Sequence, residues 1–142
     1  MIKTLWWTLI LVGLAAPAAA DPAATAALNA YRTAQGRSTL TYSDRLDAAA
    51  RAHAGDMARR GFFSHTGSND STVGDRVRAQ GYRYCFVAEN IAKGQRTLEQ
   101  VMKSWKTSSG HRKNMLHNKA TEFGLARADG DIWVMVLGTP GC

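Results

Sequence analysis

The sequence has few features that would divide or anchor the chain. It contains only three prolines among 142 residues, with no internal repeat, low-complexity tract or Pro-rich linker. Beyond the first twenty residues, no stretch resembles the run of about 20 apolar residues that spans a membrane. We therefore expect a single domain over residues 21–142, which is enough chain for one core and too little for two ordinary ones.

Residues 1–20 have the pattern of a cleavable export signal. Lys3 precedes an apolar run from Leu5 to Ala16, and small residues at Ala18–Ala20 come just before Asp21. The pattern predicts an exported protein, periplasmic or secreted outside the cell, with an uncleaved anchor as the alternative. No cysteine stands at the predicted cleavage site, so lipid attachment there is excluded.

Acidic residues are scarce compared with basic ones. The chain has 18 Lys and Arg against 11 Asp and Glu, a formal net charge of +7 at pH 7, and the basic residues are spread along the sequence. Such a charge favours anionic partners. With an export signal, we expect anionic lipids or acidic cell-envelope polymers in preference to nucleic acid, and a monomer. A solvated basic surface that serves only solubility is the alternative.

Cysteine is also rare, because only Cys85 and Cys142 are present. Export would place both where disulfides persist, so we expect them to form a disulfide bond with each other. Two free thiols are the alternative. Pairing would remove the thiolate that Cys85 would need to act as a nucleophile.

Hydrophobic periodicity and capping residues predict helices in the first part of the chain and a hairpin at its end. Helices are expected over residues 23–34, 44–60, 72–80 and 97–107, and strands over residues 82–91, 123–128 and 132–137. Asp129-Gly130 is a strong hairpin turn signal. The order favours an α+β domain in which helices cover a small antiparallel sheet.

Three residues stand out as candidates for chemistry. His65 lies in an irregular loop, His111 follows a glycine that breaks a helix, and Glu89 is a carboxylate in an apolar strand, which needs a partner if it is buried. If the three converge, they suit a divalent ion such as zinc with water in an open position. They could instead transfer protons. Their spacing matches no compact metal motif and leaves both readings open, beside a purely structural one.

Four segments in this order resemble the CAP superfamily, the cysteine-rich secretory or SCP-like proteins, and in particular its bacterial branch. They are residues 62–65 (Phe-Phe-Ser-His), 88–91 (Ala-Glu-Asn-Ile), 105–116 (Trp-x-x-Ser-x-Gly-His-Arg-x-Asn-Met-Leu) and 121–125 (Thr-Glu-Phe-Gly-Leu). The resemblance covers nearly all of the chain after residue 26. It implies an α-β-α sandwich with a central groove.

The resemblance also implies a set of groove residues. In relatives a tetrad of two His and two Glu lines the groove, and some of these proteins bind zinc or another divalent ion. His65, Glu89 and His111 match three members of the tetrad. Ser108 stands near the position of the second glutamate, so a weaker or differently coordinated metal is expected.

Two functions from different classes follow as hypotheses. The first is a binding module whose groove, with His65, Glu89, Ser108 and His111, holds a lipid, glycan or envelope polymer. The second is a metal-dependent hydrolase of an extracytoplasmic substrate, with Glu89 as the candidate base on a metal-bound water. A third reading makes the tetrad remnant a polar network that only holds the sandwich together. The sequence leaves open whether the protein is an enzyme.

Overall fold

The computed structural model describes residues 21–142, so the predicted export signal lies outside the described residues. The helices are α1 (Pro22–Ala34), α2 (Asp44–Arg60), α3 (Val73–Ala79), α4 (Leu98–Thr107) and α5 (Ser109–Met115), and the strands are β1 (Thr41–Tyr42), β2 (Tyr84–Lys93), β3 (Glu122–Ala128) and β4 (Ile132–Pro140).

The strands form one four-stranded sheet in the order β1-β3-β4-β2. Strand β4 pairs antiparallel with both β2 and β3, while the two-residue β1 pairs parallel with β3. The sheet is therefore mixed, whereas the sequence predicted an antiparallel one. The parallel pair comes from β1, the short strand between α1 and α2, which the sequence analysis did not predict. Strand β2 lies at an edge, so one side of its backbone is not paired within the sheet.

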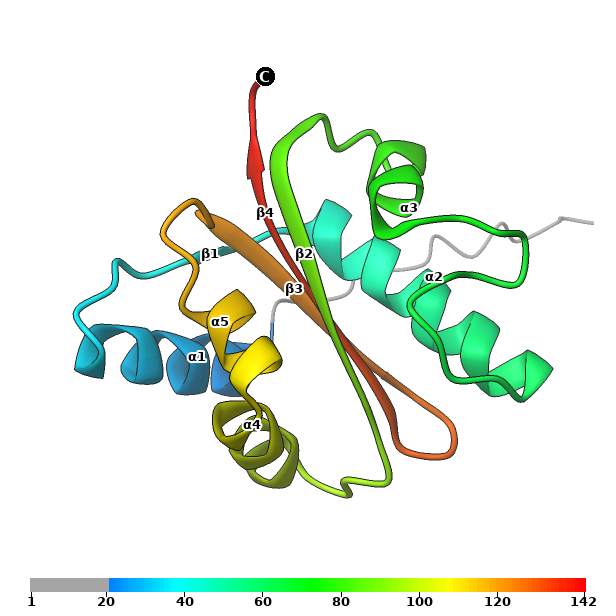
Figure 1. Cartoon of the computed structure of the whole chain (residues 1–142), viewed down its shortest axis with the longest axis horizontal. Coiled ribbons are helices and arrows are strands. Elements are labelled where there is room, and N and C mark those ends of the chain that lie inside the picture. The colour runs from blue at the N-terminus through cyan, green and yellow to red at the C-terminus, as the bar shows by residue number, and fades with distance from the viewer. Residues whose placement is uncertain (1–20) are drawn as a thin grey trace, which may run out of the picture.

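Helices cover both faces of the sheet. In Figure 1, α1, α4 and α5 lie on one side of the strands and α2 and α3 on the other. Alternate residues of β4 pack against the two helical layers. Trp133, Met135 and Leu137 pack with the layer of α1, α4 and α5, and Val134 and Val136 pack with the layer of α2 and α3. This period of two is what a strand buried on both faces requires. The architecture confirms the predicted α-β-α sandwich.

The predicted helices over residues 23–34, 44–60, 72–80 and 97–107 and the terminal hairpin are present within a residue or two at most ends. The strand predicted from residue 82 begins at Tyr84, because the Tyr82 N–H donates to the Val77 carbonyl (3.0 Å) and completes the end of α3. Helix α5 was not predicted. Ser108, at φ −90° and ψ 122°, ends α4 and at once begins α5.

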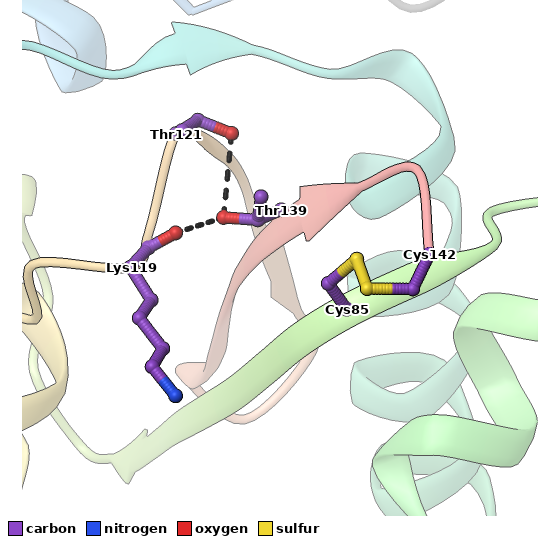
Figure 2. The surroundings of a disulfide bond; sticks show 5 residues. All are labelled: Cys85, Lys119, Thr121, Thr139 and Cys142. Atoms are coloured by element: carbon purple, nitrogen blue, oxygen red, sulfur yellow. Dashed lines mark hydrogen bonds between the residues drawn. A yellow bond between two sulfur atoms is a disulfide. The ribbon is translucent and has the colours of Figure 1, made fainter.

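A disulfide joins Cys85 to Cys142, as predicted, with a Cα–Cα distance of 4.9 Å and a sequence separation of 57 residues. Figure 2 shows it fastening the C-terminal residue to the start of β2, beside the contacts of Thr139 with Thr121 and with the Lys119 carbonyl. Closing a loop of that length stabilises the fold by about 4 kcal/mol in the chain-entropy description.

Candidate functional site

Edge strand β2 positions the candidate site between the two helical layers. Successive side chains of a strand point to opposite faces, so Glu89 faces the layer of α2 and α3 while Asn90 faces α5. Both are buried, with 7% of Glu89 and none of Asn90 exposed. Two adjacent polar side chains in an otherwise apolar strand therefore contact both helical layers.

Glu89 is held between a cation and an imidazole. Its Oε2 accepts a hydrogen bond from Arg76 Nη2 of α3 at 2.8 Å, and its Oε1 accepts one from His65 Nδ1 at 2.8 Å. Arg76 also donates to the Ser71 carbonyl at 2.7 Å and to the His65 carbonyl at 2.9 Å. The guanidinium thus neutralises the buried carboxylate and holds two points of the loop between α2 and α3.

His65 presents its ring to solvent from this anchored position. Its side chain is 59% exposed, and Nδ1 is engaged by Glu89, which leaves Nε2 for a ligand. A carboxylate bonded to one ring nitrogen fixes the tautomer and orientation of a histidine. The sequence predicted that a buried Glu89 would need a partner, and the structure supplies two.

His53 of α2 lies behind this pair. The ring is buried, its Nε2–H donates to the Ser64 carbonyl at 2.8 Å, and the same nitrogen is 3.8 Å from Glu89 Oε1. Burial lowers the pKa of His53 below its ordinary value, although the nearby Glu89 opposes the shift. His53 is therefore a neutral core histidine that supports the loop through Nε2, while its buried Nδ1 has no hydrogen-bond partner among residues 21–142.

His111 stands on the opposite wall, in α5. Asn90 Nδ2 donates to the His111 carbonyl at 3.1 Å, and Asn114 Nδ2 donates to Asn90 Oδ1 at 2.9 Å, so the helix is bonded to the strand beside Glu89. Burial, followed by the charge of His65, lowers the pKa of His111. Its Nδ1 is buried and has no hydrogen-bond partner among residues 21–142.

These walls enclose a groove of about 650 Å³ along the outer edge of β2. All four site residues predicted from the sequence line it: His65, Glu89, Ser108 and His111. Its remaining lining comes from β2, α5 and the residues after α5, namely Phe86, Val87, Ala88, Gly110, Lys113, Asn114 and His117. Arg76, which sequence reasoning missed, anchors the groove from α3 without lining it.

The fit of this groove to a metal ion is limited. Within residues 21–142, no three His, Cys, Asp or Glu side chains are grouped so that they could hold a metal. Both carboxylate oxygens of Glu89 are already engaged, by Arg76 and by His65. In this arrangement Glu89 fits the role of an orienting partner, and His65 and His111 could each offer an imidazole nitrogen to a ligand.

No helix between residues 21 and 142 is long and apolar enough to cross a membrane.

Two solved structures have a similar fold. One is an extracellular protein containing an SCP domain from Bacillus anthracis str. Ames (TM-score 0.78, 25% identity, 82% of this chain and 39% of that chain). The other is an outer surface protein from Borrelia burgdorferi (TM-score 0.76, 21% identity, 82% of this chain and 90% of that chain).

Two proteins of Bacillus subtilis are similar to this chain in sequence. YkwD of Bacillus subtilis (strain 168) is 39% identical over 106 residues, which cover 74% of this chain and 41% of YkwD. The membrane protein YlbC of the same strain is 27% identical over 97 residues, 68% of this chain and 28% of YlbC. The chain thus spans less than half the length of either relative. The profile of the CAP group, the cysteine-rich secretory protein family, matches residues 25–137. This chain therefore belongs to the cysteine-rich secretory protein family, by sequence and by fold.

Proposed function

We propose that this CAP domain is a binding module whose groove along β2 holds a polar ligand, a glycan or another polymer of the cell envelope. The observation that carries the proposal is that hydrogen bonds hold a histidine in place on each side of the groove. His65 is oriented by the buried Glu89–Arg76 pair, and His111 is bonded through its backbone to Asn90, the next residue of the same strand.

The energetics of burial support a role beyond stability. A buried ion pair is often no more stabilising than apolar residues of the same volume, because both charges lose their hydration. Glu89 and Arg76 are 7% and 8% exposed, yet they lie beside an exposed imidazole. Holding a contact residue in one orientation reduces the entropy that binding would otherwise lose.

The lining favours a polar ligand over a lipid chain. Seven of the eleven residues that line the groove carry hydrogen-bonding side chains, and its apolar side chains are those of Phe86, Val87 and Ala88 of β2. An acyl chain prefers an apolar cavity, whereas a sugar or polymer backbone offers hydroxyl and carbonyl groups to imidazole, amide and hydroxyl side chains.

A divalent cation such as zinc is the second candidate for the groove. The hydrogen bond from His65 Nδ1 to Glu89 resembles the support that carboxylates give to metal-binding histidines. His65 and His111 would hold the ion, which would add a positive charge to the site. The hydrolase alternative would require Glu89 as a base, and the engagement of both its oxygens favours binding over that role.

Native mass spectrometry of the protein purified from its own extracytoplasmic compartment tests the proposal. The wild type is compared with His65→Ala/His111→Ala and with Arg96→Ala, a control whose side chain is exposed and does not line the groove. We expect an adduct on the wild type and the control that is absent from the double variant, and its mass distinguishes a metal from an organic ligand.

Two results would contradict the proposal. The same adduct on the double variant would place the ligand elsewhere. A bare mass for all three proteins, together with a lower Tm for the double variant alone, would favour a polar network that only stabilises the sandwich.

A further inference from the structure

A second recess beside the groove is lined almost entirely by basic and neutral polar residues. This cationic pocket has a volume of about 400 Å³ and is lined by Arg37, Ser109, Arg112, Lys113, Leu116, His117 and Asn118. No carboxylate is among the lining residues. Lys113 and His117 also line the groove, so the two recesses adjoin along α5 and the turn after it.

A buried guanidinium lies behind the cationic pocket. Arg32 of α1 is 1% exposed, and it donates to three carbonyls: Ser38 (2.8 Å), Met115 (2.6 Å) and His117 (3.3 Å). None of the ion pairs within residues 21–142 includes Arg32 or a pocket residue. Burial, and then the charge of Arg37, lowers the pKa of Arg32. The pocket therefore concentrates positive charge, and no carboxylate of the described residues forms an ion pair with it.

One hydrogen-bond donor of the pocket is already oriented. The Lys119 N–H donates to His117 Nδ1 at 3.2 Å, so a neutral His117 carries its proton on Nε2. The ring stacks on Phe86 with centroids 4.1 Å apart and 18° between the planes. Burial and the charges of Lys119, Lys113 and Arg32, in that order, lower the pKa of His117, which is consistent with a positive surrounding field.

We propose that the cationic pocket binds a phosphate group, with Arg37, Arg112 and Lys113 supplying charge and His117 an oriented donor. Two guanidinium forks suit the several oxygens of a phosphate better than the two of a carboxylate. The buried charge of Arg32 strengthens the attraction, since a charge of low exposure is screened less by salt than a surface one. The inference stands on the pocket alone and does not depend on the ligand proposed for the groove.

The test is an NMR and calorimetric titration of the folded protein with inorganic phosphate, and with acetate at matched ionic strength. We expect saturable shifts confined to the signals of the pocket residues, with weaker binding of acetate. Arg37→Gln/Arg112→Gln should weaken phosphate binding about tenfold or more, because the loss of even one of its charge-assisted hydrogen bonds costs about that factor. Arg59→Gln/Arg96→Gln removes the same charge from exposed positions outside the pocket and should change the affinity less than about twofold.

Equal losses in the two double variants, shifts spread over the whole surface, or equal binding of acetate would each overturn the proposal. His65→Ala/His111→Ala should leave phosphate binding unchanged, which separates a failure of this site from a failure of the groove. Binding to vesicles that contain phosphatidylglycerol, compared with a soluble polyphosphate, then distinguishes a lipid headgroup from a polymer as the source of the phosphate.

Discussion

Substitution of Arg76 by methionine tests whether the Glu89–Arg76 pair holds the groove. Methionine keeps much of the length and apolar stem of arginine but removes the charge 2.8 Å from Glu89 Oε2. The side chains of Arg76 and Glu89 are 8% and 3% exposed, so water cannot readily replace the lost partner. Leaving one member of a buried pair without the other costs about 3–5 kcal/mol.

That cost is a large part of the about 5–15 kcal/mol that stabilises a typical domain. Urea unfolding at neutral pH, followed by far-UV circular dichroism, measures it directly. Arg78→Met on the same helix is the matched control. Arg78 is 60% exposed, lies 3.5 Å from Asp75 and donates to the Tyr84 hydroxyl at 2.9 Å, and the loss of these surface contacts should cost about 1–2 kcal/mol.

A double-mutant cycle separates the pair from its surroundings, because Arg76 also donates to the carbonyls of Ser71 and His65. Glu89→Gln removes the carboxylate charge, so Arg76→Met should cost less in the Glu89→Gln background than in the wild type, by about 1 kcal/mol or more. An additive cycle, or a cost of Arg76→Met below about 1 kcal/mol, would refute the argument that this pair anchors His65.

Two further predictions concern stability. Because burial lowers the pKa of His53 from 6.5, the unfolded chain binds its proton more readily, and stability should fall as the pH drops below about 6.5, by at most about 1.4 kcal/mol per pH unit from this residue. Urea unfolding from pH 7 to 5 should show a smaller loss for His53→Gln, and an unchanged loss would contradict the assignment. Gly124→Ala should destabilise by about 3 kcal/mol or more, because its Cβ would strike the backbone of Leu46 and Asp47 in α2. Gly110→Ala, where a Cβ meets nothing within 4 Å, should be neutral or stabilising when both variants are compared by urea unfolding.

The elements that the sequence predicted well are those with local signals. Helix α2 has an apolar stripe and ends at Gly61 with φ 69°, the left-handed conformation that favours glycine. The hairpin follows Asp129-Gly130, and Gly130 has φ 76°. Helix α5 escaped prediction because Ser108–Gly110 resembles a loop when read alone. The contacts that stabilise α5 are distant in sequence, since Met115 is fully buried against the sheet and α1.

The site residues, too, include some that the sequence indicated and some that it did not. The resemblance to the CAP family gave His65, Glu89 and His111, and local chemistry indicated that Glu89 needs a partner. Neither identified Arg76, because a single sequence does not tell which arginine lies opposite a given carboxylate once the chain folds. The cationic pocket was equally hidden, because its residues belong to α5, the turn after it and the segment after α1.

Two adjacent residues of β2, Glu89 and Asn90, bond to the two sides of the groove. Glu89 binds the α2–α3 side through Arg76 and His65, and Asn90 binds α5 through the His111 carbonyl. Because adjacent side chains of a strand point to opposite faces, a single edge strand can fasten both helical layers while its own outer edge remains between them. The strand therefore contributes to the separation of the two imidazoles, because it is bonded to both layers.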